Sequence, residues 1–195
     1  MTHDEILEAA AQIFSQKGFH GASMQDIAEA VHLQKASLYH HVNSKQEILL
    51  ELLDKALDLL IACMQEVMAR PLPTDEKLHQ SMVVYLRTLL EHRDLTAVLF
   101  LEHRSLDPEL RARHILRRDR FEQLWRDLIQ QGLNEGLFSC PNTDMTGRAL
   151  MGVMNWAITW YHPDGKLSPV EIADLFAGLF LDGLLVRQDR SASQG

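Results

Sequence analysis

The sequence predicts an all-α protein of about nine helices. Apolar residues recur at helical spacing in nearly every segment, and no stretch alternates between apolar and polar residues as a strand does. Only 10 Gly and 6 Pro occur in 195 residues, which argues against a turn-rich all-β fold. Apolar residues make up 46% and charged residues 24%, a balance typical of a globular protein that excludes a disordered chain.

Three short helices separated by tight breaks are expected at the N-terminus. The first has an apolar face over residues 6–14 and is expected to end at Gly18, which tolerates the left-handed conformation of a helix cap. Ser23, with an acidic residue three positions later, forms the capping box of a second helix of about two turns. After a break at residues 32–33, a third short helix is expected over residues 35–41.

A long fourth helix is expected to follow. Ser44 and Glu47 have the spacing of a full capping box, and Pro71 and Pro73 end the helix. The remaining helices are expected at residues 74–91, about 95–103, about 107–135, about 143–161 and 168–186. The predicted organisation is therefore a small domain over residues 1–47, a larger one over residues 48–187 and a flexible tail over residues 188–195.

Composition also limits the partners and the compartment. The net charge of −8 argues against a protein that neutralises nucleic acid over its whole surface, but it allows a local basic footprint. The two cysteines lack CxxC spacing and are expected to be free thiols. The N-terminus has no apolar signal region, and no apolar run approaches the ~20 residues of a membrane span. We expect a soluble cytoplasmic protein with no membrane partner.

Residues 23–47 have the helix lengths and spacing of a helix-turn-helix, the DNA-binding arrangement of two short helices around a tight break. The second helix of this pair is so short and so polar that core packing alone does not explain its presence. From Val31 through Gln46 the chain contains no Asp or Glu, but it contains Lys35 and Lys45. This window is either a solvated face that lacks acids by chance or a surface kept compatible with phosphate.

The same segment resembles the N-terminal domain of the TetR/AcrR family of repressors. The matching residues are Ile6-Leu7-Glu8-Ala9-Ala10, Phe14, Gly18, Ser23, Asp26-Ile27-Ala28, Leu38-Tyr39-His40-His41 and Ser44-Lys45-Gln46-Glu47. The resemblance implies a dimeric regulator, with a repressor as the family expectation, that binds a palindromic double-stranded DNA operator. It also implies that a larger C-terminal domain dimerises and takes up a small-molecule inducer. The chain departs from the family at His32 and Ala36, where Gly is common, and at Val42, where Phe is common.

Within that frame, roles in DNA binding follow from position on the helices. The start of the recognition helix should meet base edges in the major groove, through Gln34, Lys35, Ala36 and Ser37. The residues expected to contact phosphate are Ser23, Tyr39, His40 and Lys45. Ser23 has a capping role as its alternative, and Tyr39 is otherwise a half-buried aromatic at the domain seam.

The last helix is too apolar for a single buried face. Between Val170 and Val186 only three side chains are polar, so the helix needs cover on more than one side. A partner subunit would provide that cover, and the preceding helix would complete the dimer seam with Met145, Leu150, Met151 and Met154. The alternative is a central helix inside the core of one monomer.

Residues 151–168 resemble a narrower TetR subgroup that regulates fatty-acid and sterol breakdown and responds to acyl-CoA thioesters. The matching residues are Asn155-Trp156, Trp160-Tyr161, Pro163-Asp164-Gly165 and Leu167-Ser168. We therefore expect an apolar pocket between the helices of residues 74–161. The candidate ligand-binding residues are Leu86, Leu89, Phe100, Arg104, Phe121, Trp125, Trp156 and Trp160.

Arginines between Arg104 and Arg120 would meet the CoA phosphates, although interleaved acids leave a solvated face of ion pairs as the alternative. For each individual Trp of the candidate pocket, packing in the core is the simpler alternative.

No catalytic motif is found. The sequence lacks GxSxG, a P-loop, GxGxxG and HExxH, and its ten His have no metal-ligand spacing. We expect no enzyme activity, no metal and no cofactor. The rival interpretations are an all-α enzyme and a helical interaction module acting on an apolar ligand.

Overall fold

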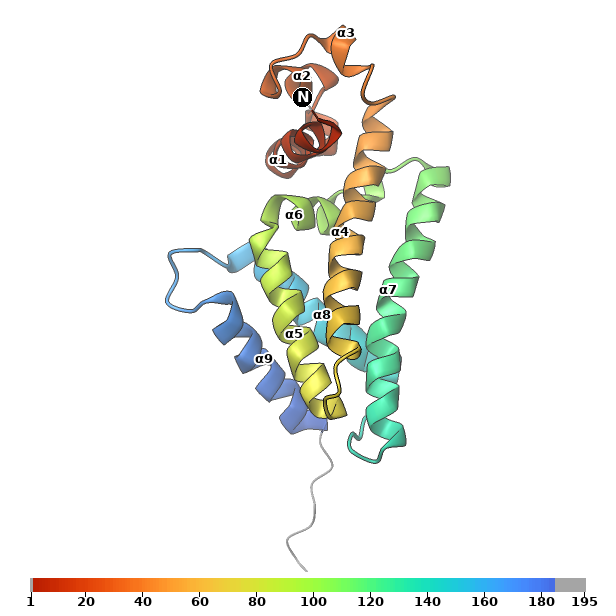
Figure 1. The fold of residues 1–195 in the computed structure, drawn as a ribbon, viewed down its shortest axis with the longest axis vertical. Helices are drawn as coiled ribbons and strands as arrows, with labels where there is room; N and C mark the ends of the chain where they lie inside the picture. Colours follow the sequence, from red (N-terminus) through yellow and green to blue (C-terminus); the bar gives the residue numbers. More distant parts are fainter. Residues whose placement is uncertain (1, 185–195) are drawn as a thin grey trace, which may run out of the picture.

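The computed structural model describes residues 2–184, which form nine α-helices and one 3₁₀ turn with no extended strand (Figure 1). The elements are α1 (His3–Gly21), α2 (Met24–Ala30), α3 (Lys35–Leu38), α4 (Lys45–Met68), α5 (Thr74–Glu91), α6 (Arg93–Leu101), η1 (His103–Ser105), α7 (Pro108–Asn134), α8 (Thr143–Trp160) and α9 (Pro169–Leu184). The predicted all-α fold is confirmed. The predicted tail over residues 188–195 and the end of the preceding domain lie outside the described residues.

Helices α1, α2 and α3 form one end of the molecule (Figure 1). The Ser23–Asp26 capping box at the start of α2 is present in both directions. Gly18 has the positive φ of 71° expected of it, but it kinks α1 and the helix continues to Gly21. His32, at the break after α2, also has a positive φ, 54°, which few residues other than Gly adopt readily.

Helix α3 is shorter than predicted and ends at Leu38, so the expected helix over residues 35–41 is corrected. The reason lies in the backbone hydrogen bonds. The amides of His40 and His41 bond to the carbonyls of Ser37 and Leu38, three residues back rather than four. These three-residue bonds tighten the chain into a turn after one turn of α-helix.

Helix α4 connects the N-terminal helices to the rest of the molecule, and along it the chain passes from the top of Figure 1 into the centre. Ser44 caps it by accepting from the Glu47 amide, but the return bond of the predicted full capping box is missing. Instead, the Glu47 carboxylate accepts a hydrogen bond from the Asn43 side chain at 2.7 Å. The predicted domain boundary at residues 47/48 falls in the first turn of this continuous helix.

The larger part of the molecule packs α5 between α4 and α9, with α7 alongside α4 and α8 crossing behind (Figure 1). Its core centres on Tyr85 and Trp125, both fully buried, whose rings meet edge to face at 5.4 Å. Gly132 near the end of α7 is required sterically, because a Cβ there would lie 2.0 Å from the Phe138 ring.

Two further boundaries differ from those expected. Helix α6 ends at Leu101, and His103 belongs to the separate turn η1 rather than to that helix. Helix α8 ends at Trp160, and Tyr161 is extended, with φ −68° and ψ 135°.

Candidate DNA interface and ligand site

Helix α3 presents most of the predicted base-reading side chains to solvent. Gln34, Lys35 and Ala36 are exposed, and Ser37 is half-buried. Leu38 is fully buried in the core and anchors the helix, which packs against α2. His40 is also exposed, and Tyr39 keeps 46% of its surface accessible.

Lys45, a predicted phosphate contact, lies half-buried with its ammonium engaged inside the protein. Its Nζ donates to the carbonyl oxygens of Phe19 at 2.8 Å and Ala22 at 2.7 Å. The same atom lies 4.3 Å from the centre of the Phe19 ring. Lys45 thereby fastens the first turn of α4 to the end of α1.

Ser23, another predicted phosphate contact, is exposed, and its hydroxyl is shared with Asp26. The hydroxyl donates to the Asp26 carboxylate at 2.6 Å and accepts from the Asp26 amide at 3.1 Å. Hydrogen bonds from Lys17 and Ser23 hold the pKa of Asp26 well below its usual range.

A cavity of about 210 Å³ lies between α4, α5, α6, α7 and α8. Most of its walls are apolar or aromatic, which suits an apolar ligand group. The lining residues are Leu57, Tyr85, Leu99, Phe100, His103, His114, Arg118, Phe121, Glu122, Met151 and Asn155. We call this space the inner cavity.

His114 is the unusual member of this wall. It is 1% exposed, and neither of its ring nitrogens has a hydrogen-bond partner in the described chain. Burial, followed by the nearby His103 and Arg118, lowers its pKa to about 4, so the imidazole is neutral at pH 7. A neutral imidazole has one donor and one acceptor, and leaving them unpaired in a buried place costs about 1–3 kcal/mol each.

Tyr85 and Asn155 supply a second polar element of the inner cavity. The Tyr85 hydroxyl donates to Asn155 Oδ1 at 2.6 Å, joining α5 to α8. Burial raises the pKa of Tyr85, which keeps the phenol protonated.

The structure brings together only part of the predicted ligand site. Phe100 and Phe121 line the inner cavity. Leu86, Leu89 and Trp125 are buried in the surrounding core but are not among its lining residues. Arg104, Trp156 and Trp160 are exposed, the last two at 67% and 42%, so the structure does not group them with the cavity.

Sequence reasoning missed His103 and His114 as cavity residues. The sequence places Arg118 among the candidate arginines and Asn155 in the quoted subgroup match. Nothing in the helical spacing distinguished His114 from the other nine His.

The α7 arginines are divided among different partners. Arg111 donates to the carbonyls of Arg104 and Leu106, which fixes the turn before α7. Arg117 forms ion pairs with Asp54 and Asp58 on α4. Arg113 and Arg120 are exposed and form no ion pair or hydrogen bond within residues 2–184.

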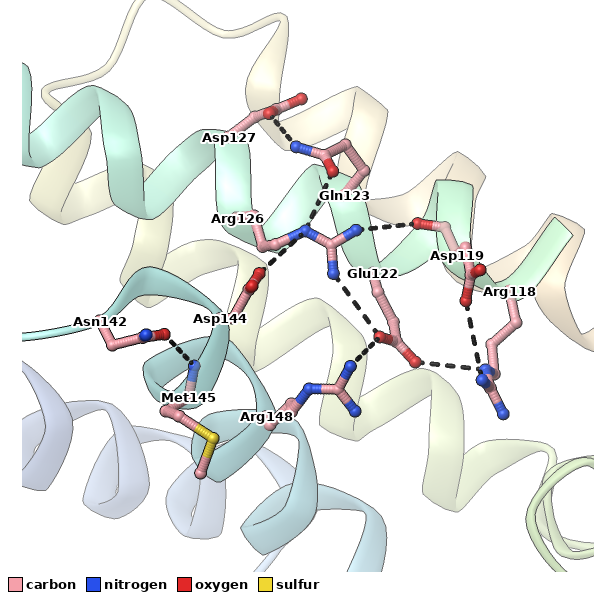
Figure 2. A network of polar contacts seen from close by, with 10 residues as sticks. All are labelled: Arg118, Asp119, Glu122, Gln123, Arg126, Asp127, Asn142, Asp144, Met145 and Arg148. Atoms are coloured by element: carbon pink, nitrogen blue, oxygen red, sulfur yellow. Dashed lines mark hydrogen bonds and ion pairs between the residues drawn. The ribbon is translucent and has the colours of Figure 1, made fainter. Parts of the chain in front are cut away.

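On the other flank of α7, Glu122 forms ion pairs with three arginines, as Figure 2 shows. Its carboxylate pairs with Arg118 at 3.2 Å, Arg126 at 3.6 Å and Arg148 at 3.8 Å, tying α7 to α8. Arg126 also pairs with Asp144 at 3.4 Å. An open basin over this network is lined by four carboxylates, from Asp119, Glu122, Asp127 and Asp144, but by only two arginines.

Helices α8 and α9 leave a broad apolar face uncovered. Exposed side chains include Met145 at 64%, Trp156 at 67%, Leu175 at 58% and Leu179 at 73%. A Cβ built on Gly152, Gly178 or Gly183 would meet no atom within 4 Å. Helix α9 lies on the outside (Figure 1), so the alternative of a central helix in one monomer core is wrong.

Three of the predicted seam residues lie elsewhere. Leu150, Met151 and Met154 are buried inside the protomer, against its own core, so only Met145 of the predicted set is exposed at the surface. Their place on the outer face of α8 is taken by Val153 and Trp156.

Within residues 2–184, no helix is long and apolar enough to cross a membrane. The same part of the chain holds no group of three His, Cys, Asp or Glu arranged for a metal ion.

Comparison with known proteins identifies both parts of the fold. Residues 6–52 match the tetR family of bacterial regulatory proteins, and residues 71–184 match the Tetracyclin repressor-like, C-terminal domain. The chain belongs to the TetR family. It is a ligand-responsive transcriptional regulator with a helix-turn-helix domain and a ligand-binding C-terminal domain, and dimerisation is typical of its family.

Among its relatives is the transcriptional repressor KstR2 of Mycobacterium tuberculosis, 28% identical over 92% of this chain and 91% of KstR2. The structure of the TetR family regulator PfmR from Thermus thermophilus is 36% identical, with a TM-score of 0.84 over 91% of this chain and 97% of PfmR. AibR, in complex with isovaleryl coenzyme A and operator DNA, is 28% identical, with a TM-score of 0.83 over 91% of this chain and 96% of AibR. These TetR relatives are transcriptional regulators, not enzymes.

Proposed function

We propose that this regulator binds a palindromic operator as a homodimer and that an acyl-CoA thioester in the inner cavity releases it. The observation that carries the ligand assignment is His114, a neutral imidazole buried without a partner in a mostly apolar cavity. A thioester carbonyl would accept from its N–H while the acyl chain lies against Phe100 and Phe121.

The size of the inner cavity supports a short acyl group. Ligand pockets for drug-sized molecules span roughly 300–1,000 Å³. At about 210 Å³ this cavity would hold an acyl chain of a few carbons and leave the CoA moiety outside. AibR, crystallised with isovaleryl coenzyme A, provides a relative that binds such a ligand.

In this proposal α3 enters the major groove, and Gln34, Lys35, Ala36 and Ser37 meet base edges. Tyr39, His40 and Ser23 contact phosphate. Lys45 reaches phosphate only by giving up the carbonyls of Phe19 or Ala22, so its first role is to hold the helix-turn-helix on α4.

The uncovered face of α8 and α9 is proposed as the dimer seam. Its exposed apolar side chains and its open glycines would allow close helix packing against a second copy. A two-fold dimer presents two copies of α3 to the two halves of a palindrome.

The test is calorimetry with short acyl-CoAs, free CoA and free fatty acids. We expect the acyl-CoAs to bind more tightly than CoA or the acid alone. His114→Leu should weaken acyl-CoA binding about tenfold, the scale of one buried hydrogen bond, whereas the exposed control His162→Leu should not. Preference for an uncharged aromatic compound over every thioester would contradict the acyl-CoA assignment.

The rival function, an all-α enzyme acting on the same ligand, is tested in the same samples. Mass spectrometry of the ligand after prolonged incubation should recover the intact thioester, since the protein is a regulator. Hydrolysis or transfer of the acyl group would favour the enzyme.

A further inference from the structure

One short groove on the outside of the α4–α7 seam carries an excess of positive charge. It is lined by Asp54, Arg113, Leu116, Arg117 and Arg120, three guanidiniums against one carboxylate. We call it the arginine groove. Arg113 and Arg120 are exposed and unpaired within the described residues, so their charges are available to an external anion.

The other open hollows near the ligand domain carry the opposite charge or mixed charge. The basin of Figure 2 has four carboxylates and two arginines, so it repels a polyphosphate. A groove between α1 and α4 is lined by Asp4, Glu51, Asp54 and Asp58 with Lys55 alone, and it is also acidic. Among these surfaces of the described chain, the arginine groove is the one whose charge suits phosphate.

The arginine groove borders the same two helices as the inner cavity. Leu57 lines the cavity from α4, three residues after the groove residue Asp54. On α7, the cavity residues His114 and Arg118 each directly follow a groove residue, Arg113 and Arg117. The two spaces therefore lie on adjoining faces of one helix pair.

Arg117, which lines the groove, ties α7 to α4. Its guanidinium pairs with Asp58 and, at 3.5 Å, with Asp54. Burial raises the pKa of Asp54 even with the positive charge of Arg117 beside it. This carboxylate is therefore poorly solvated, and moving Arg117 away would leave it exposed to repulsion from Asp58.

We propose that the arginine groove holds the phosphate groups of an acyl thioester whose acyl part fills the inner cavity, and that Arg117 exchanges Asp54 and Asp58 for phosphate. This inference rests on the proposed function and assigns the head-group end of the same ligand. Because α4 carries Asp54 and Asp58 and begins at Lys45, the exchange acts on the helix that holds the DNA-binding domain.

The experiment compares isovaleryl-CoA with isovaleryl-pantetheine, which has the same thioester but no phosphate, by calorimetry at low salt. Wild-type protein should bind the CoA ester at least tenfold more tightly. The double variant Arg113→Ala/Arg120→Ala should remove most of this difference and leave pantetheine binding unchanged. Arg148→Ala, in the acidic basin, is the matched control and should preserve the difference.

Equal affinity of the two esters for wild-type protein would show that the arginine groove does not bind phosphate, while the thioester function would stand. The same conclusion would follow if Arg148→Ala, and not the double variant, removed the difference in affinity between the two esters. Failure of both esters to bind would overturn the groove and the proposed function together.

The exchange at Arg117 has its own variant. Asp54→Asn/Asp58→Asn removes the carboxylates that compete with phosphate, so isovaleryl-CoA should bind several-fold more tightly while isovaleryl-pantetheine does not change. Asp119→Asn/Asp127→Asn makes the same change of charge in the basin and should have a smaller effect. Unchanged affinity in the α4 variant, or an equal gain in the basin variant, would contradict the exchange.

Discussion

The side-chain amide of Gln46 bridges to the turn that carries Ser105. Its Nε2 donates to the Ser105 carbonyl at 3.0 Å, and its Oε1 accepts from the Asp107 amide at 3.0 Å. Ser105 belongs to η1, whose first residue, His103, lines the inner cavity. The preceding residue, Lys45, bonds to the end of α1. Two consecutive residues of α4 thus connect η1, which lines the inner cavity through His103, with the end of α1 in the DNA-binding domain.

We predict that Gln46→Leu uncouples the two functions. Both operator and ligand should still bind when each is measured alone, because Gln46 belongs to neither site. The change in operator affinity caused by ligand should shrink by a large part of the usual coupling of about 1–3 kcal/mol. Fluorescence anisotropy on labelled operator measures this, with Gln65→Leu, exposed on the same helix, as the control. Full coupling in Gln46→Leu would show that the bridge transmits nothing.

Lys45 and Lys35 should differ in what they affect. Lys45→Ala removes two hydrogen bonds and a ring contact, so the free energy of unfolding should fall by about 1–3 kcal/mol and binding to all sequences should weaken. Lys35→Ala should leave stability unchanged and alter preference at particular base pairs by about 1–3 kcal/mol. Thermal unfolding and binding to a panel of operator variants measure both effects.

The salt dependence of binding separates two roles of Lys45. A phosphate contact adds about one unit to the salt slope, whereas a purely internal tie does not. If the two lysine variants behave alike in both assays, the assignment of α3 as the base-reading helix is wrong.

His114 should make the fold sensitive to acid. The unfolded chain binds a proton at this His near pH 6.5, but in the folded chain the pKa is about 4. Stability is therefore unaffected above pH 6.5 and falls as the pH drops from 6.5 to 4, by on the order of 3 kcal/mol. The titratable and charged groups around the imidazole are His103, Arg117, Arg118 and the Glu122 carboxylate.

Urea unfolding between pH 7 and 4 tests this prediction. His114→Gln should flatten the decline relative to wild type, and the exposed control His162→Gln should not. An equal decline in wild type and His114→Gln would mean that other groups cause the acid sensitivity.

Dimerisation should fail when charge enters the face of α8 and α9. Leu179 is 73% exposed in the protomer, so Leu179→Glu should not disturb the protomer core and should yield monomers in sedimentation velocity. Phe180 is half-buried, so Phe180→Glu would also affect the fold. Leu116→Glu, on α7 at 66% exposure, is the matched control. An intact dimer in Leu179→Glu would move the interface elsewhere.

Local signals predicted most of the fold, because helix caps and prolines act over a few residues. Helix α5 has the predicted bounds, and Ser23 caps α2 as expected. The end of α3 could not be predicted, since the change to three-residue hydrogen bonds after Leu38 has no marker in the sequence.

The ligand site was harder to predict because it depends on which way each helix is rotated. Trp156 and Trp160 share a face of α8, as their spacing predicts, but that face points outward. His114 lies between arginines in the sequence and is nevertheless buried, because its face of α7 turns toward the inner cavity.

The central claim is that operator and acyl-CoA bind this dimer with opposing effects. Fluorescence anisotropy of labelled operator, titrated with isovaleryl-CoA, measures how the ligand changes operator affinity. Calorimetry of isovaleryl-CoA with and without operator measures how operator changes ligand affinity. We predict that the ligand weakens operator binding and that operator weakens ligand binding by the same factor. Equal ligand affinity with and without operator, or tighter operator binding in its presence, would contradict release by an acyl-CoA.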